Sequence, residues 1–189
     1  MEKEDIDIMI QLHNKWLQND KSGVRADFSN MNLRKINLSG VNLSMANFYS
    51  CDLGEANLSG ANLEGCNFEG AVVKKANLTS AKLRLCNIVN ATFDESNMSG
   101  ADIRDVCGKT SSLQRVNLTD ALAQGCNLEN SDLDYSNISG SNFTDAILIR
   151  VDFKKVRMKK TVFLGAVLTG AANYESAMTM SQKREIVIF

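Results

Sequence analysis

A large apolar residue recurs at every fifth position of this chain, and no other feature constrains its fold as strongly. The register runs from Phe28 to Leu168, and among its 29 positions only Gly108 and Ala123 are not large and apolar. Chance composition cannot produce such a register. The period of five therefore reflects a repeating structural unit.

Each five-residue unit has a second regularity. The residue two places before the large one is small in every unit except those with Met31 and Ile36, and the residue between the two is Asn or Asp in 19 of the 29 units. An inward, outward, inward alternation is typical of a short strand. The other two residues are mostly polar, and 9 of the 12 glycines occupy the second of them, which suits the positive φ of a type II turn. Three strand residues and a two-residue corner, repeated without a break, predict an all-β solenoid.

The motif Ala-(Asn/Asp)-(Leu/Phe)-x-x resembles the pentapeptide-repeat family, and the match covers roughly residues 26 to 170. The resemblance implies a right-handed β-helix of square, quadrilateral section with four units to the coil. The 29 units would then form about seven coils, a rod roughly 34 Å long at the spacing of neighbouring strands.

With four units to the coil, residues 20 apart in the sequence should stack on one another. The phenylalanines agree, because Phe28, Phe48 and Phe68 fall in one column and Phe143 and Phe163 in another. One column of corner pairs alternates in charge, which predicts a ladder of opposite charges worth about 0.2–1 kcal/mol per step. Its members are Arg34-Lys35, Gly54-Glu55, Lys74-Lys75, Asp94-Glu95, Gln114-Arg115, Asp134-Tyr135 and Lys154-Lys155.

The two ends of a solenoid need covers, because they expose the apolar core and unpaired strand edges. We therefore expect three regions: residues 1–22 as a capping helix and turn, 23–170 as the pentapeptide-repeat β-helix, and 171–189 as a C-terminal cap or a dimerisation element. Apolar residues at helical spacing place the capping helix at residues 4–18. The segment Val106 to Ser112 interrupts the pattern, and a bulge or small loop is expected there.

Charge and composition exclude several classes of protein. The net charge is −1 and no apolar run is long enough to span a bilayer, so neither membrane insertion nor direct nucleic-acid binding is expected. The first residues are acidic where a secretory signal would be basic and then apolar, which predicts a cytoplasmic protein with its five cysteines as thiols.

The sequence offers no catalytic or cofactor site, and we expect no enzyme activity, no cofactor and no metal. His13 is the only histidine, and its position beside Trp16 favours packing in the cap. Gly108-Lys109-Thr110 resembles the end of a phosphate-binding loop, but that motif also needs glycine where Ile103 stands. Four cysteines occupy the small core position and no C-x-x-C pair exists, whereas Cys107 is expected to be an exposed thiol.

Two segments remain as candidate interaction surfaces. A dense basic cluster follows an acidic stretch at residues 120 to 145, and an apolar tail ends the chain. The first comprises Lys154, Lys155, Arg157, Lys159 and Lys160, and the second comprises Ile186, Val187, Ile188 and Phe189. The tail predicts a homodimer formed through the C-terminal end, with a cap on the same chain as the alternative.

These observations favour a non-catalytic rigid rod that binds another protein of unknown identity. The family resemblance adds an alternative, since some pentapeptide-repeat proteins are DNA mimics that bind type II topoisomerases such as gyrase and protect against quinolones. Those proteins are strongly acidic along the rod. This chain departs from that pattern, because basic pairs recur every second coil on one edge.

Overall fold

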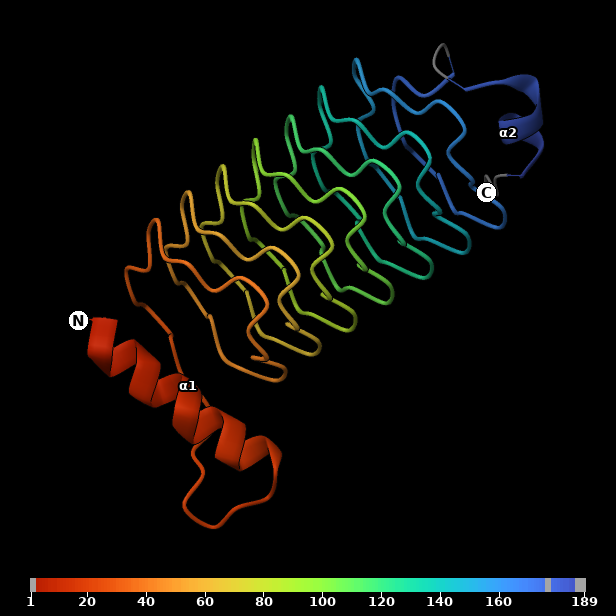
Figure 1. Cartoon of the computed structure of the whole chain (residues 1–189). Helices are drawn as coiled ribbons and strands as arrows, with labels where there is room; N and C mark the ends of the chain where they lie inside the picture. Colours follow the sequence, from red (N-terminus) through yellow and green to blue (C-terminus); the bar gives the residue numbers. More distant parts are fainter. Residues whose placement is uncertain (1–2, 176–177, 186–189) are drawn as a thin grey trace.

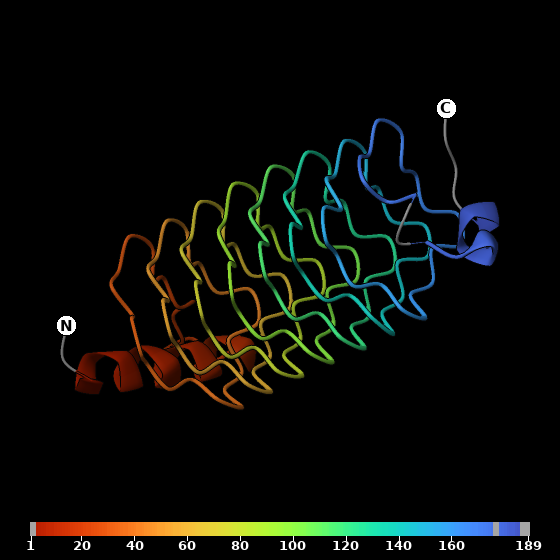
Figure 2. The ribbon, with the colours of Figure 1, turned by 90° about the horizontal axis from the view of Figure 1, so that it is seen from above.

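The computed structural model describes residues 3–175 and 178–185. Among these residues it has two helices, α1 (Lys3–Leu17) and α2 (Met180–Glu185), one at each end of a rod of stacked coils. Figure 1 shows α1 lying obliquely across the N-terminal end of the rod, and Figure 2 shows α2 at the opposite end.

The coils are held together by parallel bridges between residues that are 20 apart. These run from Asp27↔Asn47 to Asp152↔Ala172, with one bridge every five residues. Each strand is so short that only its central residue forms a bridge. The spacing means that four five-residue units make one turn of the solenoid, as the stacked phenylalanines and corner charges predicted.

One unit illustrates how the backbone bonds are satisfied. The Leu58 N–H donates to the Asn77 carbonyl in the next coil at 2.7 Å, and the Asn77 N–H donates back to Ala56 at 2.9 Å. At the corner, the Gly60 N–H donates to the Thr79 carbonyl in the next coil. The Ala61 N–H donates to the Leu58 carbonyl and closes the turn. Because this pattern recurs in successive coils, the rod buries few unpaired backbone groups.

The second residue of every corner from Asn30 to Gly170 has a positive φ. Nine of these residues are glycine, and the other twenty carry side chains, including Lys35 at 59° and Leu85 at 62°. An L-residue in this region costs roughly 1–2 kcal/mol relative to the right-handed conformation. The ladder bonds and the buried core hold the corners in this conformation even without glycine.

The interior is filled by the large and small residues of the repeat. The rings of Phe28 and Phe48 stack at 5.0 Å, those of Phe48 and Phe68 at 4.7 Å with an interplanar angle of 2°, and Phe143 stacks below Phe163 at 5.9 Å. The predicted aromatic columns are thereby confirmed. Such offset or parallel ring pairs add to the stability gained from burying apolar surface.

The prediction of a bulge or small loop between Val106 and Ser112 is wrong. Cys107 bridges to both Asn87 and Asn127, so the coil continues without interruption. Gly108 occupies the core position, and a Cβ there would lie only 2.8–2.9 Å from side-chain atoms of Leu128 and Ile88. Side chains of the neighbouring coils fill the space that a large residue at position 108 would occupy. Glycine at this position therefore changes the packing of the core but not the path of the backbone.

Each end of the solenoid is covered by a segment of the same chain. At the N-terminal end, α1 ends where Asn19 adopts a φ of 58° and the Asp20 N–H donates to Lys15, as in a Schellman cap. At the other end, the Gln182 amide is buried and donates to the carbonyls of Met158 and Thr161 at 3.2 and 2.8 Å. Gln182 thus satisfies acceptors that the coil edge would otherwise leave open.

Candidate interaction surface

The predicted charge ladder forms along one edge of the rod, although not at every step. The Arg34 guanidinium lies 2.6 Å from Glu55, and Lys74 Nζ lies 3.4 Å from Asp94. Among the described residues no ion pair joins Glu55 to Lys75. The edge therefore carries separate ion pairs between successive coils instead of a continuous chain of charges.

Further along the same edge, the ring of Tyr135 occupies the corner position that Glu55 and Glu95 hold in earlier coils. Arg115 Cζ lies 5.4 Å from the ring centroid of Tyr135, and Lys155 Nζ approaches the same ring to 5.1 Å from the following coil. Such cation–π contacts at exposed sites contribute about 0.5–1 kcal/mol. Tyr135 therefore separates two cations that would otherwise face each other.

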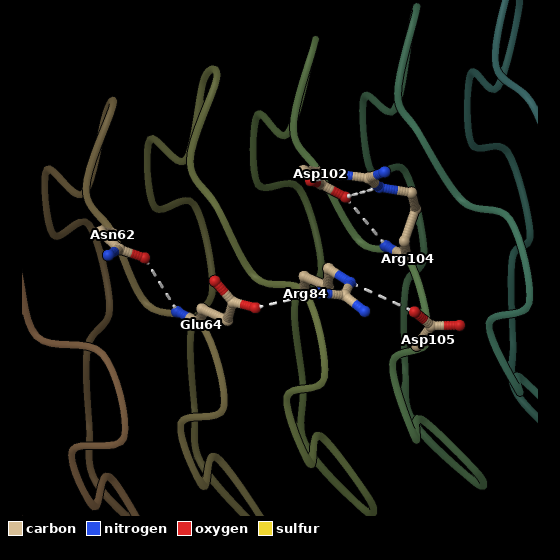
Figure 3. Close-up of polar contacts among 6 residues, drawn as sticks. All are labelled: Asn62, Glu64, Arg84, Asp102, Arg104 and Asp105. Carbon is tan, nitrogen blue, oxygen red and sulfur yellow. Dashed lines mark hydrogen bonds and ion pairs between the residues drawn. The ribbon is translucent and has the colours of Figure 1, made fainter.

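A second group of ion pairs, which the sequence pattern did not predict, lies on another edge (Figure 3). Arg84 bridges two coils, with Glu64 and Asp105 both at 3.3 Å. Beside it, Arg104 forms a bidentate contact with Asp102 at 2.8 and 2.6 Å, and this hydrogen bonding lowers the pKa of Asp102. The signal that could have revealed the two Arg84 pairs was the spacing of 20 or 21 residues between opposite charges.

The residues that resembled part of a phosphate-binding loop have structural contacts. Lys109 Nζ lies 3.1 Å from Glu129, which also accepts from Arg150 at 2.5 Å. The hydrogen bond from Lys109 is the main cause of the lowered pKa of Glu129. The Thr110 hydroxyl donates to Asn90 at 2.6 Å in the preceding coil. These side chains stabilise the surface of the rod.

A column of asparagines covers one face of the solenoid. The Asn57 amide donates to Asn37 at 3.1 Å, and Asn77 donates to Asn57 at 3.3 Å. The side-chain oxygen Oδ1 of Asn57 also accepts hydrogen bonds from the backbone N–H and the hydroxyl of Ser59. Triplets of the form Asn-x-Ser/Thr, such as Asn57-Leu58-Ser59, are thus engaged in amide ladders and turn contacts, which explains why the repeat carries them.

The basic cluster differs from most other cations on the rod. Eight of the ten lysines and arginines between residues 34 and 150 form ion pairs: Arg34, Lys35, Lys74, Lys75, Arg84, Arg104, Lys109 and Arg150. Within the part of the chain that the structure describes, none of the five cations of the basic cluster forms an ion pair, and all five are exposed. They lie along two successive corners and one strand of a single coil.

The coil beneath the basic cluster is acidic. Asp132 and Asp134 lie one coil below Asp152 and Lys154, and Asp120 lies two coils below Lys160. Burial, with Asp132 and Asp152 nearby, raises the pKa of Asp134, and its Oδ1 has no hydrogen-bond partner among the described residues. The basic cluster is therefore a narrow strip with a carboxylate border on one side.

The other candidate surface is the apolar tail. Ile186, Val187, Ile188 and Phe189 lie outside the described residues, and the expected homodimer through the C-terminal end stays a prediction. The described part of this region favours a role as a cap, because Met178 is buried in the core and Tyr174 contacts Phe153 edge to face at 6.5 Å.

The remaining reactive side chains have structural surroundings. His13 is buried and stacks on Trp16 at 5.5 Å, as expected for the cap. Cys107 is exposed, as predicted, whereas burial raises the pKa of Cys51 and Cys126 to about 12. Over residues 3–175 and 178–185 there is no group of three or more His, Cys, Asp or Glu side chains placed to hold a metal ion, and no helix suited to cross a membrane.

A comparison with family models agrees with the repeat. A model described as pentapeptide repeats matches eight copies, over residues 24–60, 51–88, 74–107 and 111–148. No curated protein matches the chain.

Solved structures with similar coils belong to proteins of several kinds. QnrB1, a plasmid-mediated fluoroquinolone resistance protein, is 17% identical, with 88% of this chain and 92% of that chain covered and a TM-score of 0.47. The protein alr5209 from Nostoc PCC 7120 is 27% identical, with coverages of 54% and 78% and a TM-score of 0.45. HetL from Nostoc sp. strain PCC 7120, involved in heterocyst differentiation regulation, is 21% identical, with coverages of 84% and 91% and a TM-score of 0.38. All three TM-scores are below 0.5, so the assignment rests on the repeat itself.

Proposed function

Since the chain belongs to the pentapeptide-repeat family, whose members fold as right-handed quadrilateral β-helices, we propose that it is a non-catalytic rod that binds another protein. In this proposal about seven coils form the rod, α1 caps its N-terminal end, and the exposed side chains of the corners and strands form the binding surface. Proteins of this family are generally structural or interaction modules.

One observation supports this function most directly. Along most of the rod the cations are paired with carboxylates, mostly of neighbouring coils, and among the described residues the last ion-paired cation is Arg150. The next five cations are exposed and form no ion pair with any described residue. A cation that forms no ion pair within its own chain is available to a partner's carboxylate, and complementary charge increases the rate and specificity of protein association.

The rod itself is well suited to present such a surface. Each coil contacts the coils on both sides through backbone bonds, so the positions of exposed side chains are fixed by the core. A partner that binds this surface needs little ordering of the rod, which reduces the entropic cost of association.

An affinity capture tests this proposal. The purified rod, immobilised through a tag, is incubated with a lysate of its source organism, and retained proteins are identified by mass spectrometry and then purified. We expect a retained protein to bind the purified rod directly with a saturable isotherm, while beads that carry the tag alone retain none of it. Failure of every retained protein to bind directly would contradict the proposal.

The DNA-mimic alternative makes a different prediction. A mimic must copy a continuous row of phosphates, whereas Arg34, Lys74 and Lys155 interrupt the acidic positions of one edge. A gyrase supercoiling assay with increasing amounts of the rod separates the two functions. We expect no inhibition and no protection from a quinolone, and either effect would favour the alternative.

A further inference from the structure

The coil that carries the basic cluster also carries exposed apolar residues. Immediately after Lys160, Val162 and Leu164 are 39% and 58% exposed. Leu122, two coils below Val162 in the same column, is 41% exposed, and Asn142 lies between them. Basic and apolar side chains thus follow one another around a single coil at the C-terminal part of the rod.

This apolar surface departs from the rule of the repeat. The outward strand position holds Asn or Asp in most units, but Ile147, Val162 and Val167 occupy it near the end of the solenoid. Asparagines at this position form amide ladders on other faces, as between Asn57 and Asn37. An aliphatic residue gives up that ladder, and where it lies beside the basic cluster it adds apolar surface that a partner can cover together with the cations.

We propose that this coil binds an acidic protein segment that also carries apolar residues. The carboxylates of the segment would pair with Lys154, Lys155, Arg157, Lys159 and Lys160, and its apolar side chains would cover Val162 and Leu164. This inference rests on the proposed function and specifies the chemistry of the partner.

The shape of the charge distribution selects a protein segment over a larger anionic surface. The basic strip is one coil wide, about 4.8 Å, and Asp132 and Asp134 border it in the coil below. A lipid bilayer or a DNA duplex would place negative charge over these carboxylates as well as over the lysines. A single segment aligned along the coil meets the cations and avoids the border.

An open hollow adjoins the basic cluster and shows which donors a bound segment can use. An open hollow of about 280 Å³ lies beside Lys159 and Lys160, above Asp120 and Gly140. The Asp120 carboxylate occupies the space beside Gly140, and the Lys159 N–H is already bonded to the Ser139 hydroxyl at 3.3 Å. The lysine ammonium groups, rather than backbone donors, are therefore the groups that bind the acidic segment.

Fluorescence anisotropy with synthetic peptides tests the inference. The probe is a labelled peptide of about twelve residues with the repeat Glu-Glu-Leu, and two control peptides replace all Glu by Gln or all Leu by Ser. We expect the Glu-Glu-Leu peptide to bind most tightly, and its affinity to fall as NaCl rises from about 50 to about 300 mM.

Three variants of the full chain locate the contact. Replacing all five cations of the basic cluster by Gln should weaken binding at least about tenfold, and Val162→Ser with Leu164→Ser about threefold or more. The matched control, Lys74→Gln with Lys75→Gln, removes ion-paired cations elsewhere and should change the affinity less than about twofold. Circular dichroism melting verifies that each variant remains folded.

Three results would overturn the inference: unchanged binding by the five-cation variant, equal binding of the Gln control peptide, or tighter binding to phosphatidylserine vesicles or duplex DNA than to the peptide. The proposed function fails separately. If a captured lysate protein binds the five-cation variant as tightly as the parent rod, the rod is an interaction module whose partner uses another surface.

Discussion

His13 Nδ1 accepts a hydrogen bond from the Ala26 N–H at 3.1 Å, and this contact joins α1 to the first coil. Because Nδ1 is the acceptor, the neutral imidazole carries its proton on Nε2, and protonation of Nδ1 would break the bond. Burial also disfavours the charged ring and lowers the pKa of His13.

Acid should therefore weaken the attachment of α1. A histidine whose pKa is lowered in the folded state contributes stability above its ordinary pKa of about 6.5, and that stability is lost as the pH falls through the folded pKa. Trp16, the only tryptophan, stacks on His13 and provides a fluorescence signal. The parent should show a fall in Tm and a fluorescence change between about pH 7.5 and 5. His13→Asn retains an acceptor without titrating, and an equal pH dependence in this variant would contradict the assignment.

Leu78→Asp should abolish folding. Leu78 is fully buried in a column of the solenoid, and an uncompensated carboxylate there costs several kcal/mol or more. Ser99→Asp, at a corner, is the matched control and should shift Tm by less than about 4 °C. Circular dichroism and size-exclusion chromatography provide the measurement. A cooperative transition for Leu78→Asp close to that of the parent would mean that every fifth residue does not form the core.

Glu95→Lys should destabilise the rod by about 0.2–1 kcal/mol, and added salt should reduce the loss. Glu95 lies 3.6 Å from Lys75 Nζ at an exposed corner. Asp94→Lys should cost more, because Asp94 also accepts hydrogen bonds from the Ser112 hydroxyl and the Gln114 N–H. Urea denaturation at two ionic strengths distinguishes the two cases. A stabilising effect of Glu95→Lys at low salt would contradict the stacking of this corner.

Gly108→Leu should destabilise the chain although it restores the repeat. Side-chain atoms of Ile88 and Leu128 already occupy the space, and overpacking a core costs about 1–3 kcal/mol. Relieving the crowding with Ile88→Ala should recover part of the loss in the double variant. Thermal melts of the parent, the two single variants and the double variant give a double-mutant cycle. A higher Tm for Gly108→Leu alone than for the parent would show that the position holds an unfilled cavity.

Gln182→Ala should destabilise the C-terminal end by about 2–3 kcal/mol, since it leaves the Met158 and Thr161 carbonyls without their donor. Gln182→Glu cannot donate and should be no better. The control is Met180→Ala, because Met180 is 74% exposed. Hydrogen exchange of the last coil measures the effect locally. Equal protection in the parent and Gln182→Ala would exclude the cap.

The sequence alone determined the solenoid, because its information is local and repeated. A core residue every fifth position specifies which side chains point inward, and residues 20 apart, such as Phe48 and Phe68, must then stack. The column containing Lys74 and Asp94 was predictable for the same reason. The basic cluster was visible as well, although its lack of ion pairs was not.

The tertiary structure decided what depends on volume and on contacts between distant residues. The sequence predicted a break at Gly108, but side chains one coil above and one coil below fill that position and keep the backbone regular. Gln182 covers carbonyls that precede it by more than 20 residues, and no repeat pattern encodes that contact. Periodicity determines the path of the chain because backbone bonding is the same in every coil, whereas side-chain packing and charge pairing depend on which residues the neighbouring coils supply.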